Sequence, residues 1–187
     1  MRNILKNRLA LSTVVTTLII LVVSVLLAGV VTYFAINVTS TRVQEENMAL
    51  TKQHVWVSLD GTAVAAIMVT NTGGRDVVLS KITSRGQAVD MTTDVFYAVA
   101  ADGDDLSLDL NYTAGATIAA ADIFGGIAGE AVASTENALV LPSGSTMAIY
   151  VNSPDSINVN DIGLTVALTV FTSQAMWYKE TNVEAAI

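Results

Sequence analysis

The chain of 187 residues contains no cysteine, only two prolines and a single histidine, His54. The absence of cysteine excludes disulfide bonds and thiolate metal ligands, so a folded domain here depends on an apolar core. A structural zinc site would have one imidazole and carboxylates only, and we reject it. The sequence also has no glycine-rich phosphate loop, no dinucleotide-binding fingerprint and no distinctive nucleophile motif. We therefore expect no cofactor and no catalytic activity, with His54 in a structural or surface role.

Charged residues are missing between Arg8 and Arg42. A helix needs about 20 apolar residues to cross the core of a bilayer, and the uncharged stretch over 9–41 exceeds that length. Lipid cannot hydrogen-bond backbone groups, which forces a helix here despite the many β-branched residues. We expect a membrane-spanning helix whose apolar centre covers residues 14–36.

Acidic residues are absent from the first 44 positions, and all 17 of them follow the apolar stretch. Three basic residues, Arg2, Lys6 and Arg8, precede it. Cations on the N-terminal side of a first helix keep that side in the cytoplasm, so the remainder of the chain is expected outside the cell. The negative charge of that remainder disfavours nucleic acid and anionic lipid as partners.

The apolar stretch is too long for an ordinary secretory signal, whose apolar region spans about 7–15 residues. It continues into TSTRVQEENMALTKQ, which is rich in helix-forming residues and has no glycine or proline. We predict one nearly continuous helix over residues 11–53, on the order of 60 Å long and roughly twice the bilayer core. A plain signal anchor is the alternative, but an anchor does not need the polar half of such a helix.

These N-terminal features resemble those of archaeal type IV pilins and archaellin-like subunits. The matching stretch is RLALSTVVTT, in which a small residue follows a short basic leader and precedes the apolar helix. The resemblance implies that a dedicated peptidase cuts between Ala10 and Leu11 and removes residues 1–10. Leu9 stands where the family usually carries a basic residue. Val15 stands where bacterial relatives carry a glutamate, so the match is to the archaeal branch.

The resemblance also implies partners and a location. The precursor would lie in the cytoplasmic membrane with its N-terminus inside and its head outside, and the mature chain would form a homo-oligomeric helical filament on the cell surface. A prepilin peptidase and pilus assembly machinery would act on it, and adhesion or surface attachment would be its task. The alternative is a membrane-anchored envelope protein that never assembles and whose head binds the surface layer or an archaellum component.

From His54 onward, short segments rich in β-branched and aromatic residues alternate with turn sequences. The predicted strands cover 54–60, 63–71, 77–84, 94–100, 138–141, 146–152, 163–172 and 175–180. Their number and spacing favour an antiparallel, immunoglobulin-like β-sandwich. The predicted fold class is therefore α+β, with one long N-terminal helix followed by a β-sandwich head over 54–187.

An insertion near 106–135, rich in alanine and glycine, interrupts the pattern of strands. We interpret it as an extended loop that carries a short helix. Small residues permit close approach of another backbone, so the insertion either contacts neighbouring subunits or covers one end of the sandwich. Loops of this length are usually functional or mobile.

Four carboxylates surround the start of this insertion, within the sequence ADGDDLSLD. They are Asp102, Asp104, Asp105 and Asp109. Alternating carboxylates in a glycine-containing loop suit Ca²⁺, but the spacing of an EF-hand loop is not met. We favour a solvated acidic loop over an ordered metal site.

Two N-glycosylation sequons are present, one at Asn37 and one at Asn111. Asn111 follows the acidic loop on the expected external surface, and we predict that it carries a glycan. Asn37 lies in the predicted helix, where a filament would bury it, and we predict no glycan there.

The proposed cleavage site can be tested by replacing its small residue. We expect Ala10→Leu to block removal of the leader and the release of filaments, because the peptidase of the resembled family cuts after a small residue. Immunoblots of the cell and of sheared surface material would report the precursor and the mature chain. Normal shedding of filaments by cells carrying Ala10→Leu would show that this cut site is wrong.

Overall fold

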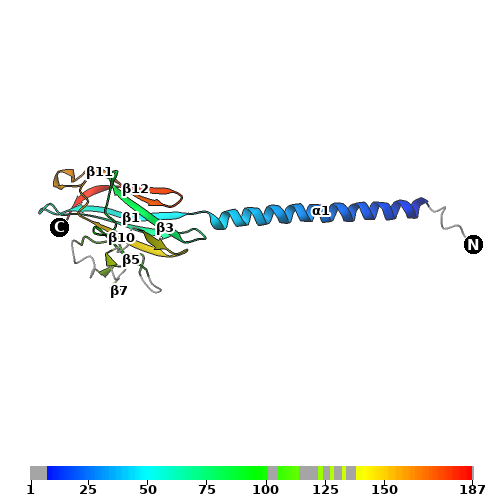
Figure 1. Cartoon of the computed structure of the whole chain (residues 1–187), viewed down its shortest axis with the longest axis horizontal. Helices are drawn as coiled ribbons and strands as arrows, with labels where there is room; N and C mark the ends of the chain where they lie inside the picture. Colours follow the sequence, from blue (N-terminus) through cyan, green and yellow to red (C-terminus); the bar gives the residue numbers. More distant parts are fainter. Residues whose placement is uncertain are drawn as a thin grey trace, which may run out of the picture. The chain divides into compact units, whose positions relative to one another are not determined.

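The computed structural model describes residues 8–100, 105–113, 122–123, 127–128, 132–133 and 138–186. The chain divides into two compact units, Met1–Val43 and Gln44–Ile187. The first contains α1 (Arg8–Gln44), and the second, called the head below, contains the β-strands (Figure 1). This confirms the predicted α+β class, in which one long apolar helix precedes a mostly antiparallel β-structure.

Within α1, the segment Leu11–Thr41 is long and apolar enough to cross a membrane, and none of it is buried within the chain. Its hydroxyl groups bond to carbonyls of the preceding turn, as in the bonds from Thr16 Oγ1 to Ser12 O at 2.9 Å and from Ser24 Oγ to Ile20 O at 2.7 Å. These bonds satisfy polar side chains inside the helix. The helix therefore presents apolar side chains over its whole circumference.

The predicted helix over 11–53 is wrong at its C-terminal end. The helix ends at Gln44, and β1 (Met48–Val57) occupies the region of the expected amphipathic continuation. β1 pairs with β2 (Ala63–Asn71) from Met48 opposite Asn71 to Val57 opposite Ala63, and it buries Met48 and Leu50 in the core. Pairing and burial outweigh the helix propensity of these residues, which differs by only a few tenths of a kcal/mol per residue. The head thus begins before His54.

The head contains a ten-stranded sheet in the order β4-β3-β11-β12-β1-β2-β10-β5-β8, with β9 paired to β3 off this path. The remaining strands are β3 (Val77–Ser84), β4 (Gln87–Ala88), β5 (Val95–Val99), β8 (Val132–Ala133), β9 (Leu139–Leu141), β10 (Thr146–Asn152), β11 (Thr165–Thr172) and β12 (Met176–Ala185). A separate pair consists of β6 (Asp122–Ile123) and β7 (Ile127–Ala128). A short 3-10 helix, η3 (Val159–Asp161), precedes β11.

A short parallel pairing joins the two halves of this sheet. Val55–Val57 of β1 lies beside Val183–Ala185 of β12, whereas the other pairings among the described residues are antiparallel. One core cluster takes residues from both halves, including Ile67 and Ile149 from one half and Leu79 and Leu168 from the other. This arrangement is compatible with the predicted β-sandwich.

The predicted segments 63–71, 77–84 and 146–152 coincide with β2, β3 and β10. In the insertion over 106–135, residues 106–113 are described and form neither helix nor strand, while three further pieces form the short strands β6, β7 and β8. None of these described pieces is the expected short helix. The rest of the insertion, together with Asp102 and Asp104, lies outside the described residues.

Residues 45–47, called the neck below, are held against two turns of the head. The carbonyl oxygen of Asn47 accepts bonds from the backbone N–H groups of Thr72 and Gly73 at 2.9 and 3.0 Å. From the β11–β12 hairpin, Thr172 Oγ1 donates to Glu46 Oε2 at 2.7 Å. A Cβ atom on Gly73 would lie 2.9 Å from both Asn47 N and Glu45 O. Only glycine therefore fits beside the neck at this position.

We expect Gly73→Ala to destabilise the head by about 1–3 kcal/mol, because the added methyl group meets backbone atoms that cannot move aside as a flexible side chain can. Urea unfolding of the full-length protein in detergent, followed by β-sheet circular dichroism, measures this change. The control is Gly29→Ala in α1, where no atom lies within 4 Å of the new Cβ. Equal midpoints for the two variants would contradict the tight contact at the neck.

Candidate functional sites

The first candidate site is the apolar surface of α1. Leucine, valine and isoleucine side chains along Leu11–Thr41 are exposed at consecutive positions, so no face of the helix is polar enough to remain in water. Exposed apolar surface of this extent indicates an interaction site for lipid or for other apolar helices. Gly29 has no side chain, so another helix could approach α1 closely at this position.

The predicted processing residues lie at the start of this helix. Ala10 and Leu11 fall in the first turn of α1, which begins at Arg8, and the side chain of Leu11 is exposed. The rest of the predicted leader, residues 1–7, lies outside the described residues. Cleavage between Ala10 and Leu11 remains a prediction.

Of the four predicted carboxylates, Asp105 and Asp109 are described, and they bind different partners. Asp105 Oδ1 accepts bonds from the backbone N–H and the hydroxyl of Ser107 at 2.9 and 2.6 Å. Asp109 Oδ1 lies 3.0 Å from His54 Nε2 and accepts the N–H of Leu110 at 2.9 Å. Among the described residues, no group of three or more histidine or acidic side chains is arranged to hold a metal ion.

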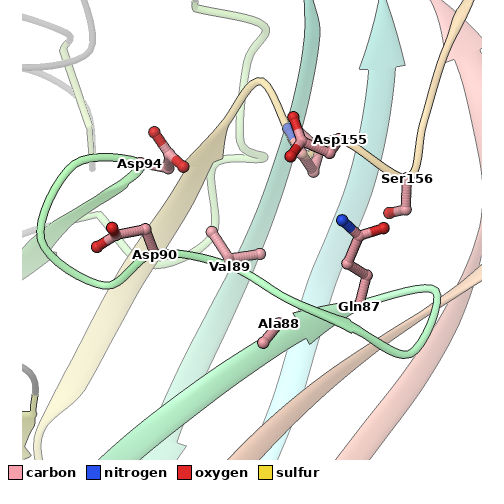
Figure 2. A pocket seen from close by; sticks show the side chains of 8 residues that line it. Gln87, Ala88, Val89, Asp90, Asp94, Asp155 and Ser156 are labelled. Carbon is pink, nitrogen blue, oxygen red and sulfur yellow. The ribbon is translucent and has the colours of Figure 1, made fainter.

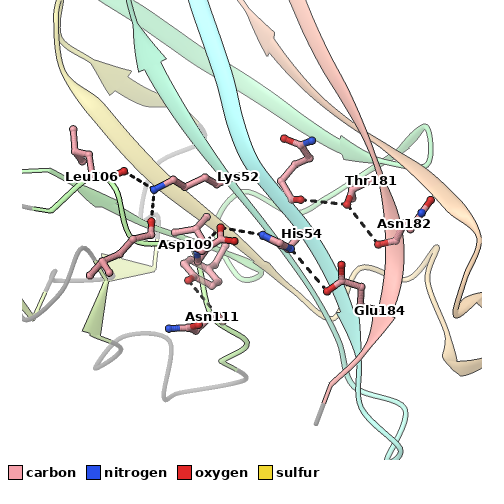
Figure 3. Close-up of polar contacts among 12 residues, drawn as sticks. Lys52, His54, Leu106, Asp109, Asn111, Thr181, Asn182 and Glu184 are labelled. Carbon is pink, nitrogen blue, oxygen red and sulfur yellow. Dashed lines mark hydrogen bonds and ion pairs between the residues drawn. The ribbon is translucent and has the colours of Figure 1, made fainter.

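Asn111 of the second sequon is exposed, while its backbone carbonyl accepts a bond from the Tyr150 hydroxyl at 3.2 Å (Figure 3). The structure thus fixes the backbone and leaves the asparagine side chain accessible, as the glycosylation hypothesis requires. Asn37 is also exposed, on α1, where its carbonyl accepts the Thr41 hydroxyl.

A set of polar contacts that the sequence did not reveal holds residues 105–113, called the anchored segment below, onto the sheet. From β1, Lys52 donates to the carbonyl oxygens of Leu106 and Leu108, and His54 pairs with Asp109 (Figure 3). The Tyr150 hydroxyl on β10 provides a further contact, to Asn111. His54 and Trp56 share a strand face by simple alternation, but β1 is irregular between Thr51 and His54 and Lys52 has a φ of 51°, so alternation alone would not have placed Lys52 with them.

The anchored segment covers an aromatic cluster on the sheet. His54 stacks on Trp56 with ring centroids 5.0 Å apart and an interplanar angle of 9°, and Trp56 meets Tyr112 edge to face at 6.2 Å. Leu110 is buried in the same cluster, beside Tyr150. Burial of the Tyr150 phenol raises its pKa to about 12, so the hydroxyl keeps the proton that it donates to Asn111. The contacts of His54 are those of a structural residue.

The pKa of Asp109 reflects these contacts. Burial alone would raise it, but the hydrogen bonds from His54 and from the Leu110 N–H, with the charges of His54 and Lys52, outweigh burial and lower the pKa below its usual value. Glu184 approaches the other ring nitrogen of His54, at 3.9 Å from Nδ1. The anchored segment is therefore held in part by a carboxylate whose ionised form these contacts favour.

A small cavity of about 150 Å³ lies between the β4–β5 connection and the loop after β10 (Figure 2). Asp90, Asp94 and Asp155 line it together with Gln87 and Ser156. Asp90 Oδ1 already accepts two bonds from Thr92, which lower its pKa. The lining is polar and acidic, and the described residues around it do not form a metal-binding group.

No protein-family model and no curated protein matches the chain. Among solved structures, it is similar to the apo PmoF2 PCuAC domain, at 14% identity and a TM-score of 0.42, over 75% of this chain and 95% of that chain. It is also similar to a β-glucosidase from Listeria innocua in complex with glucose, at 8% identity and a TM-score of 0.25, over 76% of this chain and 16% of that chain. Likeness at this level carries no argument about function.

The anchored segment should loosen in acid. A carboxyl whose pKa is lowered by folding contributes stability above its unfolded value of about 3.9, and this contribution is lost as the pH falls through the lower folded value. At neutral pH we expect Asp109→Ala to speed amide hydrogen exchange over 105–113 by roughly two- to fivefold, as for an exposed ion pair.

Hydrogen exchange by mass spectrometry at neutral pH, with Trp fluorescence followed from pH 7 to pH 2, tests this prediction. Asp60→Ala is the matched control, because Asp60 is also a carboxyl of lowered pKa but bonds within its own hairpin. Wild-type and Asp109→Ala proteins with the same exchange and the same acid transition would contradict the role assigned to Asp109.

Proposed function

We propose that this chain is the structural subunit of an extracellular, archaeal type IV pilus-like filament, assembled through α1 after removal of residues 1–10. The observation that carries the proposal is the uncovered apolar surface of Leu11–Thr41, joined to a head that has its own core. The resemblance of RLALSTVVTT to prepilin processing sites supplies the type of filament. The proposed role is structural, with adhesion or surface attachment as the task.

The apolar helix cannot remain in water. Burial of one valine, leucine or isoleucine side chain is favourable by about 1.5–3 kcal/mol, and α1 exposes such side chains from Leu11 to Val38. Lipid before assembly and like helices afterwards would both satisfy this requirement. Because one apolar environment replaces another, assembly gains little hydrophobic energy, and an ATP-driven machine would have to extract the helix.

The length of the apolar segment favours a filament over a simple anchor. At 1.5 Å per residue, the 31 residues of Leu11–Thr41 extend over roughly 46 Å, compared with about 30 Å for the hydrocarbon core of a bilayer. The acidic head would form the outer layer of the filament, where its charge supports solubility and where Asn111 is accessible to a glycan.

A specific observation favours the second candidate, a membrane-anchored envelope protein. α1 ends at Gln44, soon after the apolar segment, so the long polar continuation expected of a self-packing helix is absent. A head that follows its membrane helix this closely is what an anchor would have. In that case the head would bind the surface layer or an archaellum component, and residues 1–10 would be retained.

N-terminal peptide mass spectrometry of the protein from sheared surface material and from membranes separates the two candidates. We expect a chain that starts at or near Leu11 in the sheared fraction, with electron microscopy showing filaments there. A full-length chain that begins at Met1 and occurs only in membranes would overturn the filament proposal. An integral membrane protein with several helices should be followed as the control, because its appearance in the sheared fraction would reveal membrane fragments.

A further inference from the structure

The head exposes apolar side chains at both of its ends. β1 runs away from the neck, so the turns that touch the neck lie at one end of the sheet and the β1–β2 hairpin lies at the other. At the neck end, on β3, β9, β11 and β12, the exposed or half-buried apolar residues include Val78, Val140, Phe171, Met176 and Tyr178. At the opposite end they are Leu59, Val159, Ile162 and Leu164. We call these two groups the neck-end stripe and the tip patch.

The neck-end stripe crosses four neighbouring strands on the outer face of the sheet. Val140 of β9 lies opposite Val78 of β3, and Phe171 of β11 lies opposite Met176 of β12. Met176 is 66% exposed and Tyr178 64% exposed. The stripe also carries a positive charge, because Lys81 lies opposite Phe171 with its ammonium group 5.2 Å from the ring centroid.

The tip patch is built on loops that flank the C-terminal end of β12. Leu59 is 90% exposed in the hairpin after β1, whose Val57 carbonyl accepts the Ala186 N–H. On the other side of β12, Val183 exchanges backbone bonds with Gly163 and Leu164. Carboxylates border the patch, since Asp60 follows Leu59 and Glu184 follows Val183. Hydrogen bonds from Thr62 lower the pKa of Asp60.

The loop between β10 and β11, residues 153–164, carries Val159, Ile162 and Leu164 of the tip patch and is held by several hydrogen bonds. The Asn158 side chain accepts the Asn160 N–H at 2.9 Å, and Asp161 Oδ2 accepts the Asn158 N–H at the same distance. Arg85 pairs with Asp161 at 2.9 Å, and Ser156 Oγ donates to Ser84 O at 3.0 Å. A surface already fixed in shape loses little conformational entropy on binding, which favours a docking surface over a chance exposure of apolar side chains.

We propose that the tip patch of one copy docks on the neck-end stripe of the next copy, so that heads join head to tail. The two surfaces are both apolar, and each has a charged residue beside an exposed or half-buried apolar side chain, Asp60 after Leu59 and Lys81 opposite Phe171, of opposite sign. Contact of like patches would bring Lys81 against Lys81, or Asp60 against Asp60, and repulsion disfavours both. A contact between two different surfaces of the same chain does not close on itself unless the rotation forms a ring, and it can therefore extend along a filament.

This head-to-tail contact rests on the proposed function, because a filament would hold neighbouring copies at high local concentration. In a filament, heads stacked in this way would cover both patches on every subunit except those at the ends. The two patches share no residue with the apolar surface of α1, so head contacts and helix contacts can be tested separately.

The absence of native cysteine makes cross-linking decisive. Full-length protein carrying both Leu59→Cys and Met176→Cys is treated with a short bis-maleimide, in sheared filaments and in membranes. We expect a ladder of dimers, trimers and longer species from the double variant. A mixture of the two single variants should stop at dimers, and each single variant alone should give none. The matched control replaces Leu106 instead of Met176, because Leu106 is exposed on the anchored segment and outside both patches.

A charge exchange tests the complementarity. Lys81→Glu in the double-cysteine background should lower the cross-linked fraction by about two- to fivefold, and Asp60→Lys added to it should restore the ladder. Lys81→Gln, which removes the charge and its contact with Phe171 without adding repulsion, should have the smaller effect. If Asp60→Lys failed to restore cross-linking, Lys81 would act only within its own head and the charge pairing between heads would be wrong.

The outcomes separate this inference from the proposed function. Filaments that cross-link no better than the Leu106 control would overturn the head contact and leave the filament intact. A ladder found in membranes from a chain that never reaches the sheared fraction would support the head contact and overturn the filament. Absence of both would overturn both.

Discussion

The apolar surface of α1 is the constraint on which the rest of the molecule depends. A helix that is apolar over its whole circumference has no side suited to water, and within its own unit nothing covers Leu11–Thr41. Its environment must therefore come from outside this unit. The hydroxyl groups of Thr16, Ser24 and Thr32 bond to the helix backbone, so they do not add a polar side that would relax this requirement.

The head is a separate compact unit, and its stability depends on its own apolar core. It has no disulfides, and its core draws on both halves of a sheet joined through three residues each of β1 and β12. The neck follows α1 in the chain and precedes the first strand of the head. Its carbonyl and carboxylate oxygens are bound by two turns of the head, and Gly73 leaves the space for this approach. Residues 45–47 are thus held against the rest of the head by hydrogen bonds.

Charge has two uses in the head. On the anchored segment, Lys52 and His54 face backbone oxygens and Asp109, and they hold an acidic segment over an aromatic cluster. At the two ends of the head, charge instead borders exposed apolar residues, with Lys81 at one end and Asp60 at the other. Charges in the first arrangement form contacts within one head, whereas those in the second lie where the proposed contact between heads would use them.

Local sequence was sufficient wherever a signal was strong within one segment. The uncharged stretch determined that α1 is apolar, and the alternation of β-branched residues with turns located β2, β3 and β10 at their observed bounds. The prediction from local sequence was wrong at 48–53, where the helix-forming residues Met48, Ala49 and Leu50 belong to strand β1. Backbone pairing with β2 and burial in the core are non-local, and they exceed a helix preference of a few tenths of a kcal/mol per residue. Two further features also depended on the tertiary structure. His54 contacts Asp109, which is 55 residues away in the chain. Leu59 and Ile162 lie at the same end of the head only because distant strands pair.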